Sequence, residues 1–376
     1  MQKDIFEFLE VKTLYYDKID FTIVHKAWNC LSKYIKLPYI IHIVGTNGKG
    51  TTGRYLSSYL AQIGFDTLHY SSPHIKKFNE RIWINQEDVS NKQLQDTHEK
   101  LCRYLSDELL EKLTYFEYTT LLALFLSSNR DYLILEAGLG GEFDATNVVN
   151  SDLTLVTTIG LDHQSFLGDT IEQIAKTKMR SCNNTMIVGY QQHKLVYDIA
   201  KEFEKQNIKV FFIDNFNIPK YTNDTLPNYL HKNIELVMSA LKYIDIDIDT
   251  AIFDNIKMNG RFEKIGKNIV VDVGHNPLAA EQIVKNFINN KVILVYNSYE
   301  DKQYEEVLSI LKPIIKTLEI IKIDDKRIVD TDVLIDVAKK QNIEVKMFEN
   351  INSNENYLVF GSFLVVEEFL KKLDEK

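Results

Sequence analysis

Residues 40–52 read Ile40-Ile41-His42-Ile43-Val44-Gly45-Thr46-Asn47-Gly48-Lys49-Gly50-Thr51-Thr52. The β-branched apolar run at the start is typical of a buried strand, and the glycines after it allow a tight turn in which several backbone N–H groups converge. A helix that begins near Lys49 would aim the positive end of its dipole at the same point. Lys49 would then reach the β- and γ-phosphates of a nucleotide, and the Thr51 hydroxyl would ligate Mg²⁺.

This loop is tighter than the standard phosphate-binding loop, and a further glycine follows its lysine. The alternative is a glycine-rich turn with an incidental lysine. We favour phosphate binding because strand, glycines, lysine and threonine occur in the required order. The predicted nucleotide-binding residues of the loop are Gly45, Asn47, Gly48, Lys49, Gly50, Thr51 and Thr52.

Composition limits the classes of function that need consideration. The chain has 376 residues, enough for two domains, with 45% hydrophobic and 26% charged residues. A net charge of −9 argues against nonspecific binding to nucleic acid. Three scattered cysteines favour reduced thiols, and neither a signal peptide nor a membrane-spanning run is recognised. We expect a cytoplasmic monomer that binds neither nucleic acid nor membrane.

Apolar runs that predict strands alternate with helical patterns along most of the chain, which indicates an α/β fold with a mostly parallel sheet. The expected strands of a first domain are Ile40–Val44, Thr67–Tyr70, Tyr132–Leu135, Leu153–Ile159, Met186–Val188 and Val210–Ile213. Those of a smaller second α/β domain are Ile269–Val273, Val292–Tyr296, Glu319–Ile323, Val345–Phe348 and Leu358–Phe360. Residues 71–91 are expected to form a polar loop. The predicted domains are residues 1–258 and 262–376.

Three polar segments of the first domain follow predicted strands. Ser72 lies in Ser71-Ser72-Pro73-His74, Glu136 closes the strand before Ala137-Gly138-Leu139-Gly140-Gly141, and His163 ends Ile159-Gly160-Leu161-Asp162-His163. Open α/β sheets bind ligands at the carboxyl ends of their strands, and a carboxylate there suits Mg²⁺. The alternatives are a solvated loop, a solvated glutamate and a structural histidine. Lys178, on a predicted helix, reads by itself as a solvated lysine.

The second domain carries a further polar turn. The domain is expected to begin after Asn259-Gly260-Arg261, and the turn is Val271-Asp272-Val273-Gly274-His275-Asn276-Pro277. A tight turn with a helix-starting proline would explain the Asn-Pro pair, but not Asp272 and His275. We therefore expect Asp272 and His275 to present polar groups to a ligand.

Taken together and in order, these motifs strongly resemble the folylpolyglutamate synthase/dihydrofolate synthase family of the Mur ligase superfamily. The resemblance rests on Gly45–Thr51, Ser72-Pro73-His74, Phe78-Asn79-Glu80-Arg81-Ile82, Leu135–Gly141, Asp144-Ala145-Thr146-Asn147 and Ile159–His163. It extends to Lys18-Ile19-Asp20, Asp301-Lys302 and Gly361-Ser362-Phe363-Leu364.

The resemblance implies an N-terminal P-loop ATPase domain, a C-terminal Rossmann-like domain, and a ligase that uses ATP and Mg²⁺. Such an enzyme adds L-glutamate to dihydropteroate, to a reduced folate, or to both, through an acyl phosphate. It further implies metal binding by Thr51, Ser72, Glu136 and His163. The implied roles of the other residues are adenine recognition by Asn233, phosphate binding by Arg261, nucleotide contacts from Asp272 and His275, and carbamylation of Lys178 to help hold a second metal.

Some positions depart from the family pattern. Thr177-Lys178-Met179-Arg180 stands where relatives usually have Glu-Lys-Ala-Gly around the carbamylated lysine. Thr22-Ile23-Val24-His25 replaces a Gly-Leu-x-Arg segment that the family associates with the pterin substrate. Two other functions stay open: a Mur-type amide ligase acting on a cell-wall precursor, and a nucleotide-binding regulator without catalysis.

Overall fold

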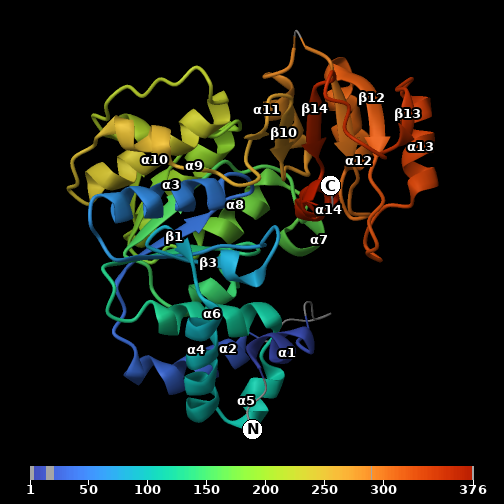
Figure 1. Ribbon diagram of the computed structural model, residues 1–376. Coiled ribbons are helices and arrows are strands. Elements are labelled where there is room, and N and C mark those ends of the chain that lie inside the picture. The colour runs from blue at the N-terminus through green and yellow to red at the C-terminus, as the bar shows by residue number, and fades with distance from the viewer. Residues whose placement is uncertain (1–3, 14–20, 289, 375–376) are drawn as a thin grey trace. The chain divides into compact units, whose positions relative to one another are not determined.

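The computed structural model describes residues 4–13, 21–288 and 290–374, so Lys18-Ile19-Asp20 lies outside the described residues. The chain divides into two compact units (Figure 1). Unit 1 comprises Met1–Tyr221 and Lys232–Ile256, and unit 2 comprises Thr222–His231 and Lys257–Lys376. Residues 222–231, which the sequence places in the first domain, group with unit 2, where the Tyr229 hydroxyl donates a hydrogen bond to Asp272 Oδ2 at 2.8 Å.

Unit 1 is built on an eight-stranded sheet with the order β4-β3-β2-β5-β1-β6-β7-β8. The run β2-β5-β1-β6-β7-β8 is parallel throughout, whereas β3 pairs antiparallel with both β2 and β4. The strands are β1 (Tyr39–Val44), β2 (Thr67–Tyr70), β3 (Ile82–Ile84), β4 (Glu87–Asp88), β5 (Tyr132–Glu136), β6 (Leu153–Val156), β7 (Thr185–Val188) and β8 (Lys209–Phe212).

Helices cover both faces of this sheet, as the βαβ rhythm predicts. The helices that begin in or belong to unit 1 are α1 (Ile5–Glu10), α2 (Thr22–Leu31), α3 (Lys49–Gln62), α4 (Asn91–Tyr104), α5 (Asp107–Lys112), α6 (Tyr115–Leu126), α7 (Gln164–Leu167), α8 (Ile171–Met179) and α9 (Lys194–Glu202). Helix α10 (Asn228–Tyr243) begins in residues that group with unit 2 and continues in unit 1. Figure 1 shows α4 and α6 on one side of β1 and α3 on the other.

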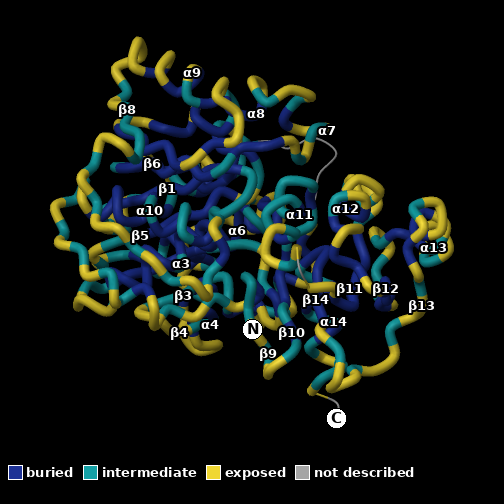
Figure 2. Tube along the Cα trace, turned by 90° about the horizontal axis from the view of Figure 1, so that it is seen from above, coloured by how far each residue is buried: buried dark blue, intermediate teal, exposed yellow. Residues whose placement is uncertain are grey.

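Strands β1, β5 and β6 form the buried centre of the unit, whereas the outer turns of α8 and α9 are exposed (Figure 2). The three strands are apolar without alternation because helices lie on both faces of the sheet. The register pairs Ile43 with Glu136 on β5 and Val44 with Val156 on β6. The carboxyl ends of these three strands therefore lie side by side.

Unit 2 holds a six-stranded sheet with the order β13-β12-β11-β14-β10-β9, parallel except for β9. Its strands are β9 (Glu263–Ile265), β10 (Ile269–Asp272), β11 (Val292–Tyr296), β12 (Ile315–Ile320), β13 (Val345–Met347) and β14 (Tyr357–Phe360). Its helices are α11 (Pro277–Val284), α12 (Tyr304–Leu311), α13 (Thr331–Lys340) and α14 (Phe363–Asp374).

Most strand predictions are confirmed to within a few residues, but one predicted loop and one predicted strand differ from the structure. The expected polar loop at residues 71–91 contains β3 and β4, which extend the sheet at one edge. The expected strand Glu319–Ile323 is displaced, because β12 covers Ile315–Ile320. Among the described residues, no helix combines the length and apolar character needed to cross a membrane.

Candidate active site

The phosphate loop lies between β1 and α3, and its first half is fixed to the segment after β6. The backbone N–H groups of Thr46 and Asn47 both donate to Thr158 O, at 2.9 and 3.1 Å. The loop ends at Gly48, whose φ of 93° is left-handed, and α3 begins at Lys49. First-turn N–H groups of a helix have no partner within the helix, so this end of α3 can receive phosphate.

The side chain of Lys49 folds back over this loop. Its ammonium donates to Gly45 O at 3.0 Å and to Thr46 O at 3.3 Å. The cation is thus held at the helix N-terminus, where a phosphate would gain both the charge and the helix N–H groups. Thr51 and Thr52 are buried in the first turn of α3.

Asn233 on α10 lies directly against the loop. A Cβ built on Gly48 would come within 2.7 Å of Asn233 Oδ1. Glycine is therefore favoured at position 48 by its left-handed backbone, and any larger residue would push the Asn233 amide aside. The amide predicted to read adenine thus stands beside the predicted phosphate site.

Glu136 and Ser72 are brought together at the ends of β5 and β2. Glu136 is 4% exposed, and its Oε2 accepts a hydrogen bond from the Ser72 backbone N–H at 3.2 Å. The contact is possible because β2 and β5 are parallel neighbours, which aligns their carboxyl ends. Glu136 is therefore not the solvated strand-end carboxylate of the alternative interpretation.

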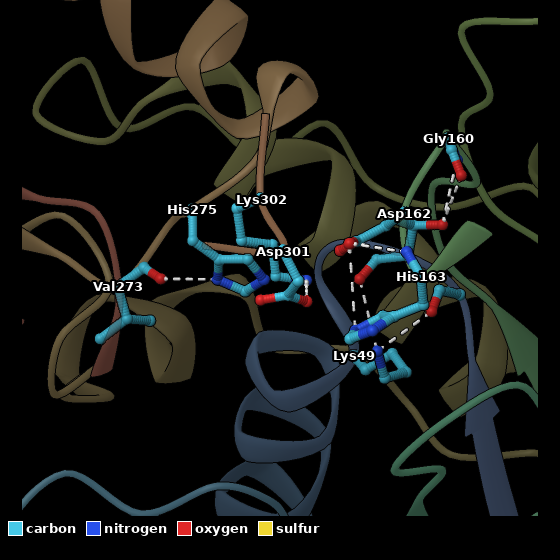
Figure 3. A network of polar contacts seen from close by, with 10 residues as sticks. Lys49, Gly160, Asp162, His163, Val273, His275, Asp301 and Lys302 are labelled. Atoms are coloured by element: carbon cyan, nitrogen blue, oxygen red, sulfur yellow. Dashed lines mark hydrogen bonds and ion pairs between the residues drawn. The ribbon is translucent and has the colours of Figure 1, made fainter. Parts of the chain in front are cut away.

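His163 follows β6, in the turn that begins α7. Its φ of 50° is left-handed, and its N–H donates to Asp162 Oδ1 at 2.9 Å. The His163 side chain is 38% exposed, whereas the Asp162 side chain is 9% exposed. Figure 3 shows Lys49, Asp162 and His163 near one another.

Lys178 is buried in α8 and 4% exposed, which contradicts its interpretation as a solvated lysine. Burial, with a smaller contribution from the Lys49 charge, lowers the pKa of Lys178 to about 7, while Asp162 and Asp144 oppose this shift. The helix backbone at Lys178 also packs on Gly141, where a Cβ would clash with it. The glycine pair after Glu136 thus lets the loop approach this lysine.

Asp144 is a further buried carboxylate of the site. Its Oδ2 accepts from the Leu139 N–H at 2.7 Å, and its Oδ1 accepts from the Thr146 hydroxyl at 2.6 Å. Burial raises the pKa of Asp144, whereas these hydrogen bonds and the Lys49 charge lower it in part. Thr146 Oγ1 also lies 2.8 Å from His42 Nε2.

The loop that follows Ser72 is ordered by its own side chains. The Glu80 carboxylate accepts the backbone N–H groups of Ile75, Lys76 and Lys77 at 2.7–3.0 Å. Arg81 Nε donates to His74 Nδ1 at 2.8 Å. These motif residues therefore shape the loop that carries Ser72.

The donor set suits Mg²⁺ bound together with phosphate. The predicted ligands offer one carboxylate, one imidazole and two hydroxyls, and Mg²⁺ is usually held by one or two carboxylates plus substrate phosphates. Over residues 4–13, 21–288 and 290–374, no group of three or more His, Cys, Asp and Glu side chains forms an all-protein metal cage. The individual assignments of Thr51, Ser72, Glu136 and His163 as metal ligands stay predictions.

In unit 2, Asp272 is a hydrogen-bonding centre at the end of β10. Its carboxylate accepts from the Tyr229 hydroxyl and from the N–H groups of Phe262 and Gly274, at 2.8–2.9 Å. Burial raises the pKa of Asp272, and the Arg261 charge opposes the shift. The turn that the sequence singled out is thus held in place by its aspartate.

Arg261 and His275 lie near this turn. The Arg261 guanidinium stands 5.0 Å from the ring centre of Phe363. His275 Nδ1 lies 3.2 Å from Val273 O, a contact drawn in Figure 3. Nucleotide binding by Arg261, Asp272 and His275 stays a prediction.

Sequence reasoning missed His42, and it named Asp144 and Thr146 only as members of the motif Asp144-Ala145-Thr146-Asn147, without individual roles. His42 reads as part of an apolar strand, so nothing local marks it. Asp144 had a usable signal, because Asp-x-Thr is typical of an Asx turn, in which the aspartate caps the following turn. The Asp144 carboxylate does accept the Thr146 N–H, at 3.0 Å.

Comparisons with known proteins identify the family to which this chain belongs. No protein-family model matches the chain. The dihydrofolate synthase/folylpolyglutamate synthase of Haemophilus influenzae is 31% identical, over 89% of this chain and 88% of its own length. The enzyme of the same name from Escherichia coli is 30% identical, over 74% of this chain and 71% of its own length.

Solved structures give the same result. Helicobacter pylori folylpolyglutamate synthetase superposes with a TM-score of 0.79 at 35% identity, covering 99% of this chain and 98% of its own. Escherichia coli FolC in complex with DHPP and ADP gives 0.83 at 25% identity, covering 98% and 96%. The chain therefore belongs to the dihydrofolate synthase/folylpolyglutamate synthase family and has its two-unit, Mur-ligase-like α/β fold.

Proposed function

We propose that this protein uses ATP and a divalent metal ion to join L-glutamate to dihydropteroate, to a reduced folate, or to both. The main support is the phosphate loop, where Lys49 stands over the N-terminus of α3 and Asn233 lies against Gly48. A related bifunctional folylpolyglutamate synthase/dihydrofolate synthase binds Mn, AMPPNP and L-glutamate.

In the proposed reaction, the acceptor's carboxylate attacks the γ-phosphorus of ATP, the bond between the β- and γ-phosphates breaks, and ADP leaves an acyl phosphate behind. The neutral amine of glutamate then adds to the acyl carbon, and the amide forms as phosphate leaves and the nitrogen loses one proton. Activation is needed because a free carboxylate is a poor electrophile. Lys49 and the first-turn N–H groups of α3 stabilise the transferring phosphoryl group, and a metal ion held by Thr51, Ser72, Glu136 and His163 would neutralise phosphate charge.

We also propose that Lys178 reacts with CO₂ to form a carbamate. The reaction joins the lysine nitrogen to the carbon of CO₂ and releases one proton, so it requires the neutral amine. Burial, which lowers the pKa of Lys178 to about 7, makes that form available near neutral pH. Neither Met179, which is buried, nor Arg180, which pairs with Glu142 at 3.1 Å, displaces Lys178 from the interior.

Phosphate release tests the ligase proposal. The protein is incubated with ATP, Mg²⁺ and L-glutamate, with either dihydropteroate or tetrahydrofolate as acceptor. Release that depends on glutamate and on at least one of these acceptors is expected. Release only with a UDP-muramoyl acceptor would identify a Mur-type ligase, and binding of ATP without any turnover would favour the regulator.

The carbamate has a separate test. ¹³C NMR with ¹³CO₂ should show a carbamate resonance in the wild type that Lys178→Met abolishes, and removal of CO₂ should lower turnover reversibly. A spectrum without that resonance would leave Lys178 as an unmodified amine. We also propose that the protein is cytoplasmic and monomeric and binds neither nucleic acid nor membrane. Size-exclusion chromatography with light scattering tests the monomeric state.

A further inference from the structure

Tyr190 is an exposed aromatic residue at the edge of the sheet that carries the phosphate loop. It follows β7, and the carboxyl ends of β1, β6 and β7 lie side by side because these strands are parallel neighbours. Tyr190 is 40% exposed. Single exposed aromatic residues are common on protein surfaces, so exposure by itself gives Tyr190 no role. Its contacts do distinguish it.

The backbone of Tyr190 is fixed to the phosphate loop through one threonine. Thr158 O accepts the N–H groups of Thr46 and Asn47, at 2.9 and 3.1 Å. The Thr158 hydroxyl donates to Tyr190 O at 3.1 Å. The next residue, Gln191, is buried. The exposed ring is thus attached to a backbone that is held in place next to the loop.

Lys232, on α10, covers one face of the Tyr190 ring. Its Nζ lies 3.1 Å from the ring centre, which is a cation–π contact. The residue after Lys232 is Asn233, whose amide lies against Gly48 of the loop. The ring is therefore connected to the loop a second time, through α10. Because Tyr190 keeps its exposure although Lys232 covers one face, the opposite face is the one that a planar ligand can contact.

We propose that the Tyr190 ring is the platform on which the base of the bound nucleotide stacks, and that Lys232 is a positioning residue that holds this ring. The inference rests on the ATP binding of the proposed function. With the phosphates at the N-terminus of α3, the base must lie beside the loop, where Thr158 and Asn233 place the ring. Stacking on an aromatic face is favourable for any planar base.

The ring would contact the part of ATP that does not react. Its contribution is then the same for the bound substrate and for the transition state, so it should lower KM for ATP without changing kcat. It should also strengthen the binding of a nucleotide but not that of a polyphosphate without a base.

Tyr190→Ala tests the platform by calorimetry in the presence of Mg²⁺. We expect the dissociation constant for ATP to rise by about tenfold, which is typical of a lost base–aromatic stack. Inorganic tripolyphosphate has no base, so its dissociation constant should change by less than about twofold. KM for ATP should rise at unchanged kcat. Tyr190→Phe keeps the ring and should bind ATP as the wild type does.

Tyr34→Ala is the matched control. Tyr34 is 46% exposed and also has a lysine, Lys33, 5.0 Å from its ring centre, but it precedes β1, at the other end of the strand from the loop. This variant should leave both dissociation constants unchanged. Equal weakening of ATP and tripolyphosphate in Tyr190→Ala would overturn the proposal, because Tyr190 would then act on the shape of the loop. Wild-type ATP affinity in Tyr190→Ala would overturn it as well.

Lys232→Met tests the positioning role, since it removes the cation and keeps most of the apolar stem. We expect the dissociation constant for ATP to rise by about threefold, in keeping with the loss of one cation–π contact. In the Tyr190→Ala background the same substitution should have no further effect. An additive rise would mean that Lys232 contacts the nucleotide by itself, which would refute its role through Tyr190.

The proposed function and this inference fail in different ways. If the wild type binds ATP but ligates glutamate to neither dihydropteroate nor tetrahydrofolate, the ligase proposal fails, and the calorimetric result still decides the platform because it requires no turnover. If the wild type is an active ligase and Tyr190→Ala binds ATP normally, only the platform is wrong.

Discussion

Gly48 and Asn233 lie so close together that a Cβ on Gly48 would stand 2.7 Å from Asn233 Oδ1. The residues are far apart in sequence, one at the end of the phosphate loop and the other on α10. The left-handed φ of Gly48 makes any L side chain unfavourable there as well. Two separable physical reasons thus disfavour alanine at position 48: the strained backbone, and the shift that the Asn233 amide would have to make.

Gly48→Ala should therefore weaken ATP binding by both routes. We expect the dissociation constant for ATP, measured by calorimetry, to rise by at least about tenfold, since backbone strain of this kind costs on the order of 1–3 kcal/mol. The Asn233→Ala, Gly48→Ala double variant relieves the steric contact and keeps the backbone strain. If the double variant binds ATP more weakly than Asn233→Ala by the strain cost alone, the two effects are independent. Wild-type affinity in Gly48→Ala would refute the close fit.

Lys49→Ala should leave the fold intact and abolish ATP turnover. The phosphate charge loses its main side-chain partner, which costs roughly 3 kcal/mol or more in the transition state. Steady-state phosphate release and circular dichroism measure the two effects. Lys176→Ala is the control, because Lys176 is paired with Glu172 at 2.7 Å on the outer side of α8. A folded Lys49→Ala protein with normal turnover would refute the phosphate-loop assignment.

Glu136→Gln should raise the Mg²⁺ concentration that gives half-maximal activity. The amide keeps the size of the side chain but removes the negative charge that a Mg²⁺ ligand supplies. His163→Ala should have a similar effect, and the double variant should lose much less than the sum of the single losses. A Glu136→Gln enzyme with an unchanged Mg²⁺ titration would remove Glu136 from the metal site.

The positions of candidate residues could be predicted from the sequence where a local pattern marks them. The phosphate loop, Glu136 and His163 each follow an apolar run that marks a strand, and all lie at the expected sheet edge. Strands β3 and β4 were missed because they are short edge strands within a polar segment. The prediction for β12 was displaced toward the C-terminus. Lys316 interrupts the apolar pattern near the start of the strand, whereas Ile320 and Ile321 form an apolar pair at its end.

Burial of individual polar residues could not be predicted, because it depends on tertiary packing. Lys178 has the sequence surroundings of a solvated lysine, yet the approach of Gly141 to its helix places it in the interior. His42 likewise becomes a hydrogen-bonding residue only because Thr146, more than a hundred positions away, lies beside it. The chemistry of these residues follows from contacts that no local pattern contains.

His42 should make the protein less stable in acid. Burial lowers the pKa of His42 from its usual 6.5 to about 4 in the folded protein. Between these pH values the unfolded chain binds a proton that the folded protein does not, so stability decreases as pH falls through this window. The slope is at most about 1.4 kcal/mol per pH unit.

Urea unfolding at pH 7, 6 and 5 measures this contribution. His42→Leu should lose stability less steeply with acidification than the wild type, whatever its stability at pH 7. Thr154→Val removes a buried hydroxyl but no titrating group, so its curve should run parallel to that of the wild type. Parallel curves for His42→Leu and wild type would show that His42 is not held neutral by burial.

Asp272→Ala should destabilise unit 2. The substitution leaves the Tyr229 hydroxyl and the N–H groups of Phe262 and Gly274 without their acceptor. A fully buried donor left unpaired costs about 1–3 kcal/mol, and these three donors are part-buried, so each should cost less than that. Hydrogen exchange followed by mass spectrometry should therefore show faster exchange in β10 and β14, which are paired, while β1 of unit 1 keeps its protection.

Tyr229→Phe removes only one of the three donors and should have a smaller effect. Unchanged exchange in Asp272→Ala would mean that the backbone alone holds the turn.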